Sequence, residues 1–212
     1  MSAPAGTSAE FWEEQYADRD PDRGTRPNAA LVDTLYGLRQ RPGSALELGC
    51  GHGGDAVWLA EQGWQVTATD VSATALARTA ALAESRRPLG RVRTEQHDLT
   101  ASLPAGEFDL VYACFFHSTL GIDRDAVLAR AAERVRVGGV FVAVDHASSA
   151  PWSWTADAGI EFPSPQQTRR SIGLVEGWSP VRVAAVRRLA TGPGGQRAEV
   201  TDNVVAVRRT RR

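Results

Sequence analysis

The sequence of 212 residues contains no lysine, so arginine supplies all 24 of its basic side chains. Its 25 acidic side chains bring the formal net charge to −1 at pH 7. Proteins that coat nucleic acid or bind anionic membranes carry an excess of basic residues, because those residues neutralise phosphates and attract anionic surfaces. This composition therefore argues against a nucleic-acid partner and against a membrane partner.

Cysteine is also scarce, since only Cys50 and Cys114 occur. Two cysteines outside any CxxC motif exclude a disulfide framework and a cysteine-rich zinc site. No apolar run approaches the roughly 20 residues that span a bilayer. Residues 1–15 also lack the basic and apolar regions of a signal peptide. We therefore expect a cytoplasmic protein.

The length is that of one domain, at about 150 residues per domain. From residue 44 onward, short apolar segments alternate with amphipathic ones. The predicted strands are 45–48, 64–70, 91–97, 108–114 and 139–146, and the predicted helices between them are 54–62, 73–84 and 124–135. Alternation at this pitch is typical of βαβ units and a parallel sheet.

Both ends of the chain depart from this alternation. Residues 9–18 and 28–39 have helical spacing, whereas 181–190 and 197–209 are strand-like and flank a Gly/Pro turn, which predicts a hairpin. The predicted fold is α/β, a doubly wound seven-stranded sheet of five parallel strands plus a C-terminal antiparallel hairpin, with helices on both faces. Within one domain over residues 1–212, we expect cap helices in 1–40, a ligand-binding core in 44–146, a lid in 147–165 and the hairpin in 180–208.

A glycine-rich turn joins the first predicted strand to its helix. It contains Glu47, Gly49, Gly51 and Gly53 in the pattern ExGxGxG. Glycine allows a tight turn and lets a ligand approach the main chain and the helix N-terminus. The acid at the strand end is the discriminating residue, because its carboxylate would repel a diphosphate but would attract a cationic ligand.

Two further acids follow the next predicted strands, Asp70 after the second and Asp98 after the third. A carboxylate in the place of Asp70 can accept hydrogen bonds from both hydroxyls of a ribose, and ligands of open α/β sheets bind at the carboxyl ends of the strands. Asp98 is placed to meet an exocyclic amine. Three acids at these strand ends suit a positively charged nucleoside without phosphates, and S-adenosylmethionine has that chemistry.

Over about residues 44–146 the sequence resembles class I S-adenosylmethionine-dependent methyltransferases. The glycine turn resembles their motif I, Asp70 and Asp98 match the acids that contact ribose and adenine, and FDLVYACFFHSTL resembles the fourth-strand motif. VGGVFVAVDH resembles the entry to the fifth strand, with Val137 where the family has proline. The segments FWEEQYADRD and GGDAVWLAEQGWQVTATDVS further resemble small-molecule branches, the tellurite-resistance and thiopurine methyltransferase-like proteins.

The resemblance implies S-adenosyl-L-methionine as cofactor and a set of residues in contact with it. These are Glu47, Gly49, Cys50, Gly51, Gly53, Asp70, Val71, Asp98, Leu99 and Cys114. On the acceptor side we expect Trp12, Tyr16, Phe116, His146, Trp152 and Trp154. Aromatic faces near a sulfonium gain cation–π attraction, and a long irregular stretch such as 147–165 is typical of an active-site lid.

His117 follows the fourth predicted strand, where the reacting methyl group would lie. A histidine there can take a proton from a substrate nucleophile. An equally good interpretation is a histidine whose hydrogen bonds are satisfied within its loop. Asp145 and His146 end the fifth strand beside the same opening, in an orienting or a catalytic role. The histidine spacing matches no known ligand pattern, so no metal is expected.

The resulting hypothesis is methyl transfer to a heteroatom (oxygen, nitrogen, sulfur or another chalcogen) of a small molecule. The first alternative is a methyltransferase acting on RNA, DNA or protein. An Asn/Asp-Pro-Pro-aromatic motif after the fourth strand is absent, which argues against a nucleic-acid substrate. The second is a nicotinamide-dependent oxidoreductase that uses the GxGxxG of the same turn, which Glu47 and Asp98 oppose. The third is a cofactor-binding regulatory module without catalysis.

Overall fold

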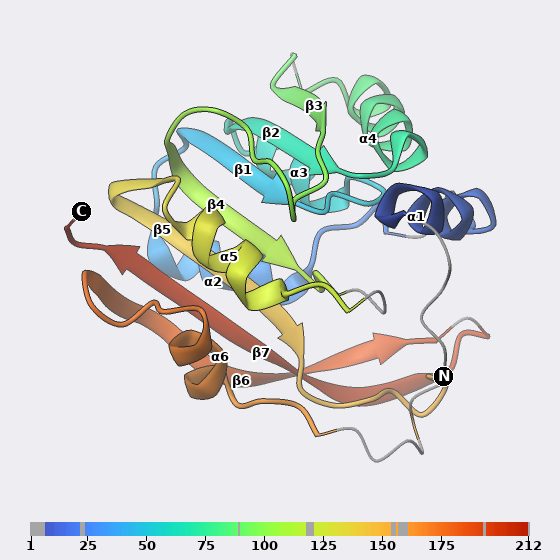
Figure 1. Cartoon of the computed structure of the whole chain (residues 1–212). Helices are drawn as coiled ribbons and strands as arrows, with labels where there is room; N and C mark the ends of the chain where they lie inside the picture. Colours follow the sequence, from blue (N-terminus) through green and yellow to red (C-terminus); the bar gives the residue numbers. More distant parts are fainter. Residues whose placement is uncertain are drawn as a thin grey trace.

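The computed structural model describes residues 7–21, 24–88, 90–117, 121–153, 156, 161–192 and 194–211. Seven strands form one sheet in the order β3-β2-β1-β4-β5-β7-β6 (Figure 1). Their bounds are β1 Ser44–Leu48, β2 Gln65–Asp70, β3 Val92–Gln96, β4 Phe108–Cys114, β5 Val135–His146, β6 Trp178–Thr191 and β7 Arg197–Arg209. The first five strands run parallel, and β7 is antiparallel to both β5 and β6. The predicted sheet is confirmed.

Helices cover both faces of the sheet, α5 in front and α2 behind in Figure 1. The bounds are α1 Ser8–Ala17, α2 Ala29–Leu38, α3 Gly54–Glu61, α4 Ala73–Arg86, α5 Arg124–Ala132 and α6 Pro165–Ser171. One core packs α2 and α3 against residues such as Val142 of β5, and the other packs α5 against residues such as Phe141. Successive side chains of a strand point to opposite faces, so both faces of β5 are buried. None of the described helices is both long and apolar enough to cross a membrane.

One helix has no counterpart in the sequence prediction. Helix α6 begins after Ser164, whose hydroxyl accepts from the backbone of Gln167 while the Gln167 side chain returns to the Ser164 backbone. This is a capping box, and Pro165 occupies the first turn, where its missing N–H costs nothing. The start signal was therefore present, but the helix spans only seven residues. Few residues of so short a helix can form an apolar stripe, so periodicity alone does not detect it.

The join between α5 and β5 differs from the prediction of a helix over 124–135. The helix ends at Ala132, and Val135 already belongs to β5, where it pairs with Phe108 of β4. The strand thus begins before the predicted residue 139, and Gly138 and Gly139 lie within β5. A register shift between β4 and β5 accommodates them, because an irregularity of this kind lets a strand continue through residues that do not pair regularly.

The N-terminal helix α1 is attached to α4 through the side chain of Glu13. Its carboxylate accepts hydrogen bonds from the Ser72 hydroxyl at 3.2 Å and from the Thr74 N–H at 3.1 Å, and another from the Ala73 N–H. The first turn of a helix has free N–H groups and a partial positive charge, both of which favour an anion. Hydrogen bonding to Thr74 holds the pKa of Glu13 below its ordinary value. This contact holds α1 beside the ends of β1 and β2.

Leu128→Ala is expected to lower the free energy of unfolding by about 2–5 kcal/mol, because a fully buried leucine of α5 leaves a cavity. The matched control is Leu189→Ala on β6, whose side chain is 55% exposed, and it should stay within about 0.5 kcal/mol of the wild type. Urea denaturation followed by circular dichroism measures both. Equal losses in the two variants would contradict the assignment of the core.

Glu13→Ala is expected to loosen α1 while the sheet stays folded. A carboxylate at an exposed helix N-terminus is worth about 0.3–1 kcal/mol, so amide hydrogen exchange in residues 8–17 should accelerate roughly two- to fivefold at neutral pH. The neighbouring exposed residue provides the matched control, Glu14→Ala, which should exchange like the wild type.

The effect of Glu13 should also depend on pH. Because its pKa is lowered in the folded chain, its stabilisation is present above the ordinary carboxyl pKa and is lost as the pH falls through the folded-state value. The difference between wild type and Glu13→Ala should therefore disappear in acid. The same exchange rates in both proteins at neutral pH would show that Glu13 does not hold α1.

Candidate functional site

The glycine turn lies at the carboxyl ends of the parallel strands, under two aromatic side chains. Gly49 and Gly51 have φ values of 72° and 55°, a left-handed conformation that glycine adopts at low cost. A Cβ at Gly49 would lie 3.0 Å from the Phe116 ring, and one at Gly51 would lie 3.0 Å from the Tyr16 hydroxyl. These two glycines therefore let α1 and the segment after β4 close over the turn.

Asp70, at the end of β2, is held in place by backbone donors. Its two oxygens accept hydrogen bonds from the N–H groups of Gly51 and Ser72, each at 3.0 Å. Burial nevertheless raises the pKa of Asp70 above its ordinary value. A buried carboxylate gains from each additional donor that reaches it. Asp70 is therefore suited to accept hydrogen bonds from ligand hydroxyls.

Glu47, near the end of β1, is a buried acid with an unused acceptor. Its side chain is 3% exposed, and its Oε2 has no hydrogen-bond partner among the described residues. Burial, together with the carboxylates of Asp55 and Asp70, raises the pKa of Glu47 well above its usual range. A buried acceptor without a donor is costly. A ligand that brings an N–H group or a positive charge to this place would offset that cost.

Two cavities above these residues share a wall and together form one cleft. The shared residues are Trp12, Tyr16, Gly49, Phe115 and His117. The first cavity is also lined by Ser8, Asp70, Val71, His97, Asp98, Leu99, Thr100, Phe116 and Ile122. The second, of about 680 Å³, is also lined by residues that include Glu47, Cys50, Gly51, Cys114 and His146. This volume lies within the range of about 300–1,000 Å³ typical of small-molecule sites.

Asp98 has a local role in addition to its place on the cavity wall. Its Oδ1 accepts hydrogen bonds from the N–H and the hydroxyl of Thr100, at 2.9 and 2.7 Å. It is exposed, whereas Leu99 beside it is buried. Asp98 therefore closes its own turn, and this turn places the acid and Leu99 on the wall of the first cavity, which Val71 also lines.

The segment after β4 enters the cleft in a strained conformation. Phe115 has a φ of 53°, which costs a non-glycine residue of the order of 1–3 kcal/mol. Its N–H still donates to the Val144 carbonyl at 2.8 Å, and its ring stacks on His146 with centroids 4.0 Å apart. Such strain persists only where the surroundings over-determine it, and it is concentrated at functional sites.

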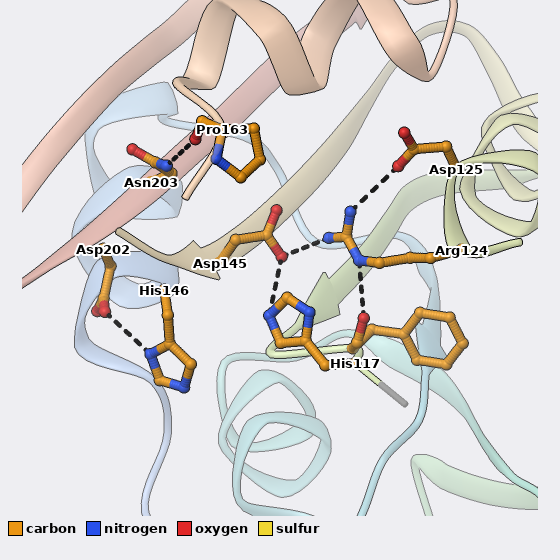
Figure 2. A network of polar contacts seen from close by, with 9 residues as sticks. His117, Arg124, Asp125, Asp145, His146, Pro163, Asp202 and Asn203 are labelled. Atoms are coloured by element: carbon orange, nitrogen blue, oxygen red, sulfur yellow. Dashed lines mark hydrogen bonds and ion pairs between the residues drawn. The ribbon is translucent and has the colours of Figure 1, made fainter. Parts of the chain in front are cut away.

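His117 lies against Asp145, the penultimate residue of β5 (Figure 2). The Nε2 of His117 is 3.7 Å from Oδ1 of Asp145, which also pairs with Arg124. Arg124 in turn donates from Nε to the Phe116 carbonyl at 2.8 Å, so it fastens the segment after β4. Burial lowers the pKa of His117 despite the opposing charge of Asp145. His117 therefore favours its neutral form.

A second histidine and carboxylate lie beside the first pair. The Nδ1 of His146 is 3.8 Å from Oδ1 of Asp202, and the two histidine rings are nearly parallel with centroids 6.0 Å apart. Asp202 is fully buried and accepts two hydrogen bonds from Arg188, at 2.5 and 3.3 Å. No sequence motif indicates a role for Arg124, Arg188 or Asp202. The one indication in the sequence is Asp202 itself, an acid within the otherwise apolar strand segment that follows residue 199.

Most of the predicted site residues line the cleft, and two of the described ones, Gly53 and Trp152, do not. A Cβ at Gly53 would lie 2.8 Å from the Thr79 side chain, so Gly53 makes room for helix α4. Trp152 lies against the β6–β7 turn, where a Cβ at Gly192 would come within 2.7 Å of its ring. Trp154 lies outside the described residues. The described residues contain no group of three metal-ligating side chains, and the absence of a metal stays a prediction.

Comparison with known proteins gives one family and one partial relative. The family described as a methyltransferase domain matches residues 46–141. A ribosomal RNA small subunit methyltransferase C from Alcanivorax borkumensis is 43% identical over 60 residues. That match spans 27% of this chain and only 18% of the relative. It therefore covers a small part of the relative.

Solved structures match almost the whole chain. One, described under the conversion of a disulfide bond into a thioacetal group during echinomycin biosynthesis, has a TM-score of 0.71 and 26% identity, and covers 95% of this chain and 92% of that one. The N-methyltransferase NodS from Bradyrhizobium japonicum, in complex with S-adenosyl-L-homocysteine, has a TM-score of 0.66 and 16% identity over 97% of this chain and 100% of its own. The chain therefore carries a methyltransferase domain over residues 46–141, in the fold of class I, S-adenosylmethionine-dependent methyltransferases.

Proposed function

We propose that this protein transfers a methyl group from S-adenosyl-L-methionine to a heteroatom of a small molecule. The observation that carries the proposal is the second cavity, which has the volume of a small-molecule site and is walled by aromatic and histidine side chains. Helix α1 contributes Trp12 and Tyr16 to its wall. An acceptor enclosed between α1 and the strand ends would be small.

The cofactor is proposed to bind across both halves of the cleft. Asp70 would hold the ribose hydroxyls, and Val71, Asp98 and Leu99 would enclose the adenine. Gly49, Cys50, Gly51 and Cys114 would line its path toward the second cavity. The fit rests on two features of this chain: the unpartnered Oε2 of Glu47, which suits the amino group, and the two glycines that keep the turn open.

The bound cofactor supplies a methyl carbon that is already activated toward nucleophiles. The chain's own contribution is mainly alignment of the acceptor, which is worth about 7–11 kcal/mol in favourable cases. A base is required where the acceptor must lose a proton. The sequence predicts His117 for this role, and His146 lies 6.0 Å from it, ring to ring. Which of the two histidines acts depends on the contacts of their ring nitrogens.

An RNA acceptor is the second candidate, because of the short ribosomal RNA methyltransferase match. It is weaker, since that match spans only 27% of this chain and 18% of the relative, and the net charge of the chain is −1. The protein's location is a separate point. The free thiols of Cys50 and Cys114 suit a reducing compartment, which supports the cytoplasm as the location of the protein.

Asp70→Ala is expected to weaken binding of S-adenosyl-L-homocysteine at least tenfold, because hydrogen bonds to a charged acceptor are worth about 1.5–3 kcal/mol. Titration calorimetry measures the affinity, and circular dichroism checks the fold. The control is Asp33→Ala, an exposed aspartate on α2 away from the cleft, which should bind like the wild type. Unchanged affinity in Asp70→Ala would contradict the placement of the ribose.

The acceptor class is tested with radiolabelled methyl groups. The full chain is incubated with [methyl-³H] S-adenosyl-L-methionine and, in separate reactions, with panels of small thiols, amines and phenols, with ribosomal RNA and with total cell protein. The expected result is label in a small molecule that depends on the chain. Label only in RNA or protein would replace the proposed acceptor class, and binding without label in any fraction would favour the regulatory module.

A further inference from the structure

We propose that His146, oriented by Asp202, is the base that removes the acceptor's proton, in place of His117. This inference rests on the proposed function, since a base is needed only if an acceptor is methylated there. The geometry points to it through three features: which nitrogen of each histidine faces a carboxylate, which groups hold that carboxylate, and whether the other nitrogen is available to the second cavity.

The sheet register itself pairs His146 with Asp202. The two residues are direct partners on the antiparallel strands β5 and β7. Opposed side chains on one face of such a pair lie about 4.5–5.5 Å apart at Cβ. Arg188 on β6 is two residues from Val186, which is the partner of Asp202, so it is a diagonal neighbour on the same face. The histidine, the acid and the arginine are therefore brought together by regular strand pairing.

The charges around Asp202 suit an acid that supports a protonated histidine. Burial alone would raise its pKa, but His146 and Arg188 more than offset this, so the pKa of Asp202 lies below its ordinary value. Asp202 thus remains a carboxylate behind the ring. Arg188 supplies two hydrogen bonds that keep it oriented. An anion so fixed selects the histidine tautomer with its proton on Nδ1 and stabilises the imidazolium that forms.

The Nδ1 contact leaves the distal nitrogen of His146 for the substrate. Figure 2 shows its second nitrogen on the side of the ring away from Asp202. The ring is held flat against Phe115, with centroids 4.0 Å apart and an interplanar angle of 14°. Glu47, Cys114 and His146 all line the second cavity. The free Nε2 therefore belongs to a side chain on the wall where the acceptor is proposed to bind.

His117 has the opposite arrangement. Its distal nitrogen, Nε2, faces Asp145, at 3.7 Å. The nitrogen that remains is Nδ1, which lies next to the ring's attachment to its own backbone and has a shorter reach. Asp145 is further committed to Arg124. In this geometry His117 fastens the segment after β4, and its role is to position that segment. Both contacts between histidine and acid are longer than hydrogen bonds, as is common before substrate binds.

In the proposed step, the proton that the acceptor loses is taken up by His146. The acceptor heteroatom donates its electron pair to the methyl carbon, the carbon–sulfur bond breaks, and its electron pair stays on sulfur. The proton of the heteroatom passes to Nε2 of His146, whose positive charge is balanced by Asp202. The His146 side chain is 44% exposed, so its proton can then leave to water. No oxidant, reductant or further reactant is required.

The tautomers test this inference without acceptor or cofactor. The full chain, labelled with ¹⁵N-histidine, is examined at about pH 8 by long-range ¹H–¹⁵N correlation, with single histidine-to-glutamine variants used for assignment. We expect the proton of neutral His146 on Nδ1 and that of neutral His117 on Nε2. A proton on Nε2 of His146 would overturn the proposal, whether or not any acceptor is ever methylated.

The second test uses turnover of whichever acceptor the labelling assay identifies. His146→Ala should lower kcat by a factor of roughly 10²–10⁴, while the affinity for S-adenosyl-L-homocysteine stays within twofold of the wild type. Added imidazole should raise the kcat of this variant at least tenfold. In His117→Ala imidazole should restore nothing, because that loss is one of positioning. Rescue of His117→Ala but not of His146→Ala would assign the base to His117. Absence of label with the wild type would refute the proposed function and this inference with it, whereas normal labelling with the proton of His146 on Nε2 would overturn this inference alone.

Discussion

Burying a carboxylate costs several kcal/mol unless charges or donors compensate for it, and this sheet buries four at one edge: Glu47, Asp70, Asp145 and Asp202. Three of them are compensated within the chain. Asp70 receives backbone N–H groups, and each of the other two receives an arginine. The fourth retains an oxygen without a donor among the described residues. The site is organised around this requirement, because every group that satisfies an acid is thereby held in place at the cleft.

The two halves of the cleft satisfy the requirement in different ways. In the half around Asp70 the compensating groups are backbone N–H groups of the glycine turn and the start of α4, so its geometry follows from main-chain conformation. In the half around Asp145 and Asp202 they are arginine side chains from other elements. Compensation of a buried acid by backbone N–H groups depends little on side-chain identity, so it suits the binding of a cofactor that many proteins share. Compensation by side chains can change with the sequence, so it suits the part of a site that selects the acceptor.

Contacts near Asp202 also attach both ends of the predicted lid, residues 147–165, to the sheet. Asn203, next to Asp202, donates to the Pro163 carbonyl at 2.7 Å (Figure 2). The Ser148 hydroxyl accepts from the Thr201 N–H at 2.8 Å. Both ends of the predicted lid are therefore attached to β7, and Trp152 packs on the distal turn of the hairpin. On the opposite side, α1 covers the glycine turn and is held by Glu13. Among the described residues, the element that covers the glycine turn is therefore helix α1.

Much of this architecture follows from local sequence. Alternating apolar segments predicted the parallel strands, and caps such as Asn28 and Ser72 begin helices where they were expected. The ExGxGxG turn and Asp70 could be recognised because strand, turn and acid lie close together in the chain. Their chemistry depends on residues that are neighbours in sequence or on adjacent parallel strands, for which the carboxyl ends necessarily meet.

The sequence by itself therefore determined the sheet, the glycine turn and the acids at the ends of the parallel strands. Tertiary structure alone decided that β7 lies between β5 and β6, and hence that Asp202 stands opposite His146. Strand order in a C-terminal hairpin and the register of an antiparallel pair are not encoded in the spacing of either segment. They are set by which register buries the apolar side chains of both faces, and the same register selects which nitrogen of His146 is left free.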